Sequence, residues 1–364
     1  MNQDVQSLIY LLSCAVNDIT PNSVKLLNMN LEGVYKIAEK HMVSAAVAVS
    51  LECAGIFSPK FDKRLARAER KAIIYENEAS QVISSLEKHC IWYMPLKGII
   101  LKDLYPKIGM REMADVDILV DKDKGESIKR IMLDLGFSVK SYGINNVDSY
   151  TKPPLSNIEI HKSLFGFQHD RKLYDYFSDI KTRLVKDENN RYGYHFNSND
   201  FYLFMIAHEY KHYINGGTGL RSLLDTYIYI NKNKLDDEYI KQETEKLGIS
   251  EFEEINRKTA LDLFRGAGVC DSELLDYIIN SGTFGNVENL VQNNINKKGG
   301  KISYLFRRLF GYTNGNYWDY LKQRHPVFYK YKILLPLLPF YRVIYGIRKY
   351  PKRIKKELKA LFSK

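Results

Sequence analysis

The chain has 364 residues, enough for about two domains with a sizeable core. With 45% hydrophobic and 27% charged residues, its composition is that of a globular protein and excludes a disordered or fibrous chain. The net charge of +11 is unevenly placed, because residues 301–364 hold 16 Lys and Arg against two acids and carry +14, which leaves −3 for the remainder. Binding to a polyanion can therefore be argued only for this basic tail.

The beginning of the chain and its cysteines indicate a cytoplasmic protein. The first 16 residues, MNQDVQSLIYLLSCAV, have no basic segment before the apolar run, which argues against a secretory signal. The apolar run from Ile333 to Tyr341 contains two prolines and is too short for a membrane span, which needs about 20 residues. The four cysteines lie far apart without a CxxC pair, which favours reduced, buried thiols over disulfides or zinc.

Hydrophobic spacing divides the chain into helical ends and a mixed centre. Residues 1–90 have helical spacing, including a long helix predicted over residues 60–88 whose inward face would contain Ile73, Ile74, Val82, Ile83 and Leu86. Residues 91–97, 114–120, 137–142, 147–152 and 158–165 are predicted strands, the last two forming a hairpin, and helices are predicted from residue 98 and over residues 128–135. The order predicts a small mixed sheet with helices on it, an α+β class of fold.

The rest of the chain is predicted to be helical, with one exposed connection at residues 281–316 that is rich in Asn and Gly. Four regions are therefore expected. They are an N-terminal helical region at 1–90, an α/β core at 91–195, a helical domain at 196–300 and a basic, aromatic-rich tail at 301–364.

Two acidic strands carry the chemistry that the sequence indicates. Asp115 and Asp117 are two residues apart on a predicted strand, so both carboxylates point to the same face. Glu159 is flanked by isoleucines on another strand, and His161 shares its face. Acids within apolar strands need a cation to neutralise them, and oxygen ligands of this kind suit Mg²⁺. A solvated surface pair is the alternative for an isolated DxD motif.

Basic residues accompany these acids. Lys97-Gly98 lies where a strand passes into a helix, a place where amides and a lysine can bind phosphate, although a plain turn with a surface lysine is the commoner case. Arg111 precedes Asp115 by four residues and can bind a triphosphate with its guanidinium group or remain a surface arginine. Arg221 and Asp225 are spaced i, i+4 on a predicted helix, where they can pair.

The segment LKGIILKDLYPKIGMREMADVDILV, residues 96–120, closely resembles the signature of the bacterial uncharacterised nucleotidyltransferase family of the polymerase-β-like superfamily. That signature contains an LKG element, a YP pair and an R-x-M-x-D-I-D-L-L-V element. Three further segments resemble later family elements, namely EIH at 159–161, HEYKH with GLRSLLD between 208 and 225, and LLPLLPFYR at 334–342. The resemblance therefore covers most of the chain.

This resemblance implies a nucleotidyltransferase core of small mixed sheet between helical regions, and transfer of an NMP from an NTP to an acceptor hydroxyl with release of pyrophosphate. It implies that Asp115 and Asp117 bind two Mg²⁺ or Mn²⁺ ions and that Glu159 is the third acid. The candidate nucleotide-binding residues are Lys97, Gly98, Arg111, His161 and Lys211. The superfamily usually has Gly-Ser in place of Lys-Gly, a pair also found in related abortive-infection-type toxin transferases. The acceptor, whether a small molecule, a sugar-containing intermediate, RNA or a protein, is left open.

The HEYKH segment, residues 208–212, also matches the HExxH signature of zinc proteases, which places two histidines on one helical face. In the extended form of that motif, Asn215 and Thr218 occupy the positions of the glycine and the last histidine, and Lys211 disfavours a bound cation. A zinc hydrolase is therefore the alternative. We favour a helix from which His208, Lys211 or His212 lines the nucleotide or acceptor side of a cleft. The other interpretation is a packed helix whose polar residues face solvent.

The tail contains an amphipathic helix. Its apolar stripe consists of Ile354, Leu358, Leu361 and Phe362, and lysines and arginines occupy its other faces. Such a helix can lie on an anionic membrane surface, contact RNA phosphates, or pack on the body through its stripe. Residues 345–364 are thus the candidate contact to an anionic surface, which would make the protein peripheral to the membrane. A non-catalytic RNA- or membrane-binding protein is the remaining alternative.

Overall fold

Five helices occupy the first 90 residues, in agreement with their helical spacing. They are α1 (Gln3–Val16), α2 (Ser23–Leu27), α3 (Leu31–Lys40), α4 (Ser44–Cys53) and α5 (Pro59–Lys88). Asn2, Asn22 and Asn30 cap the first three by accepting backbone N–H groups. The expected inward position of Ile73 on α5 is wrong, since its side chain is 59% exposed. The buried stripe passes through Ala72 and Tyr75 instead.

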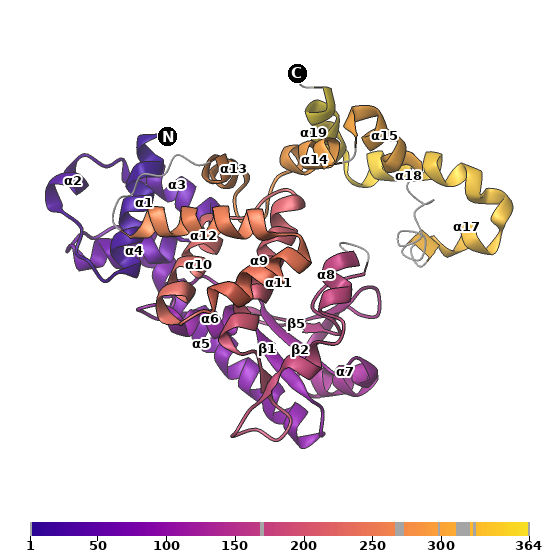
Figure 1. Cartoon of the computed structure of the whole chain (residues 1–364), viewed down its shortest axis with the longest axis horizontal. Coiled ribbons are helices and arrows are strands. Elements are labelled where there is room, and N and C mark those ends of the chain that lie inside the picture. The colour runs from indigo at the N-terminus through magenta and orange to yellow at the C-terminus, as the bar shows by residue number, and fades with distance from the viewer. Residues whose placement is uncertain are drawn as a thin grey trace.

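The computed structural model describes residues 2–167, 171–265, 273–297, 299–310, 321–322 and 325–362. A body of helices surrounds one mixed sheet, and the last helices extend to one side of that body (Figure 1). The sheet strands are β1 (Tyr93–Leu96), β2 (Val116–Val120), β3 (Ser138–Ser141), β4 (Val147–Lys152) and β5 (Ser156–His161). The expected α+β class with a small mixed sheet is confirmed.

The strand order is β1-β2-β5-β4-β3, so β2 and β5 lie in the middle of the sheet. They pair in parallel, with Asp117 opposite Glu159, whereas the other neighbours are antiparallel. The predicted hairpin joins β4 to β5. Between the strands lie α6 (Gly98–Leu101), the 3₁₀ helices η1 (Lys102–Leu104) and η2 (Lys122–Lys124), and α7 (Gly125–Asp134).

The two faces of the sheet pack against different helices. On one face, Val116, Ile118 and Ile158 pack against Tyr75 of α5 and Ile128 of α7. On the other face, apolar residues of β1 and β2 join the main core of the N-terminal and later helices. Because side chains alternate along a strand, Asp117 and Glu159 share this second face.

The helices after residue 170 contribute to the main core that lies on the side of that second face. They are α8 (Arg171–Tyr176), η3 (Ile180–Arg183), α9 (Ser198–Ile214), α10 (Leu220–Lys232), α11 (Asp237–Leu247), α12 (Ser250–Phe264) and α13 (Glu273–Ser281). A short ribbon of β6 (Val185–Lys186) and β7 (Tyr194–His195) precedes α9. The central helix α9 contributes a continuous buried run to the main core, from Phe201 to Ala207.

The last described helices differ from the expectation for residues 281–316. Instead of an exposed connection, this stretch contains α14 (Val287–Lys297) and α15 (Gly300–Phe310), while residues 311–316 lie outside the described ranges. Val291 and Ile295 of α14 bury their side chains against Leu361. Further along are α17 (Pro326–Lys330), η5 (Lys332–Leu337), α18 (Leu338–Lys349) and α19 (Pro351–Phe362).

The cysteines depart in part from the expected burial. Cys14 is buried, but Cys53 and Cys90 are exposed because they lie at the ends of α4 and α5; all three are free thiols, and Cys270 lies outside the described residues. Across the described ranges, no helix combines the length and the apolar character that crossing a membrane requires.

Gly109 sets the path of the loop that leads into β2. Its φ is +81°, and an added Cβ would lie 2.7 Å from Cγ and 2.8 Å from the backbone nitrogen of Glu69 on α5. We expect Gly109→Ala to lower the free energy of unfolding by about 2–4 kcal/mol in urea titrations, from backbone strain and overlap together. Gly55→Ala is the matched control, because Gly55 has a φ of +72° and nothing within 4 Å of its added Cβ. Equal losses in the two variants would contradict this account.

Candidate active site

Two carboxylates from the central strands form the centre of the candidate site. Asp117 of β2 and Glu159 of β5 are direct neighbours across a parallel pair, so their side chains leave the same face of the sheet. The side chain of Asp117 is only 12% exposed. Ser149 of β4 lies opposite Glu159 and places its Oγ 3.4 Å from Oε1. The flanking strands thus hold both acids in fixed positions.

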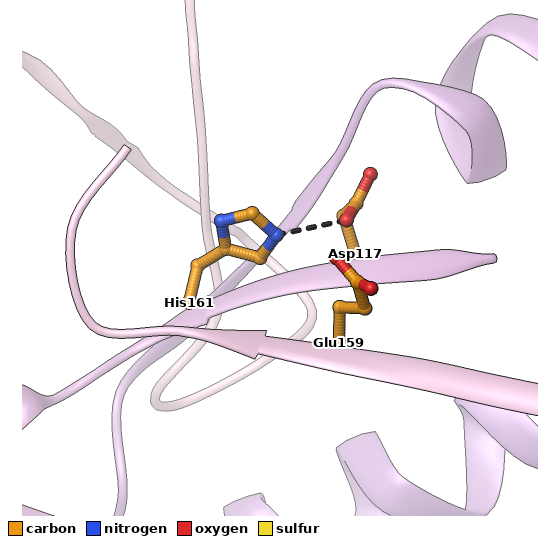
Figure 2. A group of neighbouring side chains, drawn as sticks. All are labelled: Asp117, Glu159 and His161. Carbon is orange, nitrogen blue, oxygen red and sulfur yellow. Dashed lines mark hydrogen bonds and ion pairs between the residues drawn. The ribbon is translucent and has the colours of Figure 1, made fainter. Parts of the chain in front are cut away.

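His161 completes this cluster. Its Nε2 lies 2.8 Å from Oδ1 of Asp117, and the ring is largely buried (Figure 2). One ligand atom each from Asp117, Glu159 and His161 lie within 4.8 Å of one another, and among the described residues this is the one such group of three or more potential metal ligands. The geometry therefore fits a divalent cation held by oxygen ligands, with the imidazole beside them.

Asp115 lies next to this cluster but outside it. Strand β2 begins at Val116, two residues later than expected, so Asp115 precedes the strand instead of lying on it. The carbonyl of Ala114 accepts a hydrogen bond from Tyr75 Oη at 2.8 Å instead of joining the ladder. Burial, together with the charges of Asp117 and Glu159, raises the pKa of Asp115 to about 6. Asp115 thus shares the electrostatic field of the other two acids.

Lys97 faces the acids from the end of β1. Its Nζ lies 3.8 Å from Oδ2 of Asp117 and 5.6 Å from the ring centre of Phe204. Burial lowers the pKa of Lys97, although the three acids act against this shift. Burial acts to raise the pKa of Asp117, but Lys97 and His161 outweigh it and hold that pKa well below its usual range.

The backbone of Lys97 is itself strained. Its φ of +39° is unusual for a residue with a side chain, and the strand-to-helix turn imposes it. The helix that follows, α6, is one turn long, so its amides offer less to a phosphate than the sequence suggested. Strain of this kind persists where surrounding contacts hold a residue in a required position.

Helix α9 supplies the opposite wall. Phe204, His208 and Lys211 are spaced i, i+4 and i+7, which places them on one helical face. Burial, followed by the charge of Lys97, lowers the pKa of Lys211 to about 8, while Asp117 and Glu159 act to raise it. The same two causes lower the pKa of His208 well below its usual range. Two lysines therefore face three acids in this site.

Arg111 forms a buried ion pair with Asp225 of α10. Its Nε and Nη2 each donate to one oxygen of Asp225 at 2.8 Å, and Tyr105 donates to the same carboxylate at 2.7 Å. The expected pairing of Arg221 with Asp225 is therefore wrong, and Arg221 donates instead to the carbonyl of Glu112 at 2.7 Å.

Gly98 lies against this arginine. A Cβ at Gly98 would be 3.0 Å from Nη1 of Arg111, so the glycine leaves room for the guanidinium group. The structure thus brings Lys97, Asp117, Glu159 and His161 together, with Asp115 and Lys211 near them, whereas two of the donor groups of Arg111 are engaged elsewhere.

The HEYKH segment does not form a zinc-protease site in the described residues. His208 and His212 approach each other at 3.3 Å between their Nε2 atoms, but no third His, Cys, Asp or Glu joins them among those residues. Glu209, which would be the general base, is buried and accepts a hydrogen bond from Asn256 Nδ2 at 2.9 Å. This geometry does not support the zinc hydrolase.

Glu209 provides a pH-dependent test of the helical packing. Burial raises its pKa to about 8. In the folded state the carboxyl therefore keeps its proton to higher pH than in the unfolded state, and stability falls as pH rises from about 4.5 to 8. We expect Glu209→Gln to be more stable than the unmodified protein at pH 9 by about 3–5 kcal/mol, with the difference vanishing below pH 4.5. Thermal melts across this pH range measure the difference, and Glu254→Gln, at an exposed position, is the control. Parallel pH profiles of stability for all three proteins would contradict the raised pKa of Glu209.

The sequence analysis did not identify several residues that the structure places in or beside the site. Ser149 could have been found from the hairpin register, because it lies opposite Glu159. Phe204 could have been found from its helical spacing to His208 and Lys211. The partnership of Arg111 with Asp225 spans 114 positions and has no local signal.

A small mixed sheet with two acids on adjacent central strands, faced by lysines, is the arrangement expected of a metal-assisted nucleotidyltransferase. The sequence profile of the uncharacterised nucleotidyltransferase family matches residues 28–265. The chain therefore belongs to this family. The match ends before residues 334–342, whose resemblance to the family lies outside it. No curated protein and no solved structure shows significant similarity to the chain.

Proposed function

We propose that the protein transfers an NMP from an NTP to an acceptor hydroxyl and releases pyrophosphate. The observation that supports this proposal most directly is the convergence of Asp117 and Glu159 from adjacent central strands, with Asp115 beside them. Membership in the uncharacterised nucleotidyltransferase family supports the class of reaction. The acceptor remains open among a small molecule, a sugar-containing intermediate, RNA and a protein.

The donor set suits Mg²⁺ or Mn²⁺. Carboxylate oxygens of Asp117 and Glu159 would hold a divalent ion, and Asp115 would be needed for a second. When bound, such ions supply charge neutralisation for the phosphates and for the attacking and leaving oxygens. Among the described residues Glu159 forms no ion pair, so its carboxylate is available to a cation or to the acceptor hydroxyl.

The lysines would bind the triphosphate. Lys97 and Lys211 approach the acids from β1 and α9, and both are largely desolvated. A lysine in such a position contributes a point charge to a phosphate oxygen. With a pKa of about 8, Lys211 is mainly protonated at neutral pH and can serve this purpose. Arg111 retains Nη1 beside Gly98 and would contribute from the same side.

Incubation with α-labelled NTPs, Mg²⁺ or Mn²⁺ and candidate acceptors is the direct test. Transfer of label to an acceptor, with pyrophosphate released in equal amount, is the expected result. Nucleotide binding is measured separately by calorimetry with a non-hydrolysable NTP, so that an unsuitable acceptor is not mistaken for an inactive site. A protein that binds neither NTP nor Mn²⁺ would refute the proposal.

A further inference from the structure

The helices at the end of the chain expose an unusual number of apolar side chains. Of the 27 large hydrophobic residues exposed in the described part of the chain, 15 lie between residues 302 and 362. Isolated exposed apolar residues are ordinary, but a concentration of this kind marks a surface that binds a protein or a membrane.

Helix α18 carries the clearest part of this surface. Its exposed residues Phe340, Val343, Ile344 and Ile347 recur at spacings of three and four, so they form one continuous face, the α18 apolar stripe. Their side chains are between 42% and 65% exposed. On α15, Ile302 and Phe306 are also exposed, at 85% and 60%.

The other sides of α18 are anchored to its neighbours. The rings of Tyr341 and Tyr345 stack at 5.9 Å, and Tyr341 packs against Phe328 of α17 at 5.1 Å. Arg342 donates to carbonyl oxygens at the end of α15 at 3.4 Å. These contacts fix the rotation of the helix and leave the α18 apolar stripe facing solvent.

Basic residues follow this stripe along the chain almost without opposing charge. From the end of α18 through α19, the exposed bases are Arg348, Lys349, Lys352, Arg353, Lys355, Lys356 and Lys359. The acid of this segment, Glu357, is already bound to Arg308 at 2.7 Å and to Tyr304 at 2.5 Å. The positive charge of the surface is therefore available to an anionic partner.

We propose that the α18 apolar stripe docks on an anionic lipid surface, with the adjacent lysines and arginines at the headgroups. Hydrocarbon accepts the aliphatic side chains, and anionic headgroups complement the +14 charge of residues 301–364. A second copy would bring an equal positive charge against the first, which disfavours self-association. RNA matches the charge, but its bases stack on aromatic rings, and three of the four residues of the stripe are aliphatic.

Vesicle flotation tests this docking with the full-length protein. We expect binding to vesicles containing phosphatidylglycerol, weaker binding at high salt, and little binding to pure phosphatidylcholine. The double variant Phe340→Asp with Ile344→Asp should reduce partition at least about tenfold, since it places charges where apolar contact is required. The control is Phe57→Asp with Phe284→Asp, which changes residues that are 82% and 83% exposed outside this surface.

Circular dichroism and light scattering accompany each variant. Unchanged helical content and a monomeric mass in both double variants, with binding lost only from the α18 variant, support lipid docking. Three results would overturn it. They are equal binding to neutral and anionic vesicles, no binding to either, and a dimer or a tRNA complex that the α18 variant alone abolishes.

Discussion

Replacing Asp117 by asparagine is expected to reduce NMP transfer by about 100-fold or more and to weaken Mn²⁺ binding in parallel. Asparagine has nearly the same shape and can still accept a hydrogen bond from His161, so the substitution removes mainly the negative charge. A divalent cation would bind this negative charge, and Lys97 forms its ion pair with it. Initial rates with α-labelled NTP and Mn²⁺ titrations by calorimetry or electron paramagnetic resonance give the two readouts.

Asp123→Asn is the matched control, because Asp123 is an exposed acid shortly after the same strand. Thermal melts show whether the Asp117 variant remains folded, since Lys97 loses its ion-pair partner there. A folded Asp117→Asn protein that binds Mn²⁺ and transfers NMP at the rate of the control would contradict the assignment. Glu159→Gln provides a second, independent variant, because among the described residues Glu159 forms no ion pair and accepts a side-chain hydrogen bond from Ser149.

Strand alternation predicted only part of the acidic face. It placed Asp115 and Asp117 on one strand, whereas β2 begins at Val116 and leaves Asp115 outside it. The patterns around Asp117 and Glu159 have apolar residues on either side, and each acid indeed leaves the face opposite to the apolar cluster under α5 and α7. The sequence could not give the order of the strands. Only the pairing of β2 directly with β5 brings the two acids to neighbouring positions, and this depends on long-range packing.

Composition was misleading where helical spacing was informative. Residues 287–297 are rich in Asn, which suggested an exposed loop, yet Val287, Val291 and Ile295 recur every four residues and pack against α19. The stripe expected on α19 is divided in the structure. Leu361 is buried against α14, whereas Leu358 and Phe362 are 48% and 74% exposed. A pattern of apolar residues predicts a face but not how much of that face finds a partner.

The partner of Arg111 was also beyond local patterns. A lone arginine before a DxD motif suggested a free phosphate-binding group, and an i, i+4 spacing suggested that Arg221 pairs with Asp225. In the folded chain the loop after η1 packs on α10. Arg111 of this loop, rather than Arg221, donates two parallel hydrogen bonds to the carboxylate of Asp225. The bidentate geometry and the burial of both groups favour the pair Arg111–Asp225 over the pair Arg221–Asp225.

The second large effect is expected from Asp225→Ala, which should lower the free energy of unfolding by about 3–5 kcal/mol. The substitution leaves the Arg111 guanidinium group, 7% exposed, without its counter-charge, and Tyr105 without its acceptor. Urea titrations of the full chain measure the change. The control is Asp237→Ala, since Asp237 also binds an arginine but is 80% exposed, and its loss should cost at most about 1 kcal/mol.

A double variant separates lost attraction from uncompensated charge. Because removal of both partners leaves no buried charge, Arg111→Met with Asp225→Leu should recover much of the stability that Asp225→Ala loses. The same protein would still lack Nη1 of Arg111 beside Gly98, so its affinity for a non-hydrolysable NTP tests whether this arginine also reaches the nucleotide. Recovered stability with weakened nucleotide binding assigns both roles to Arg111, and recovered stability with unchanged binding restricts it to the fold. Equal losses for Asp225→Ala and Asp237→Ala would show that the buried pair contributes no more than a surface one.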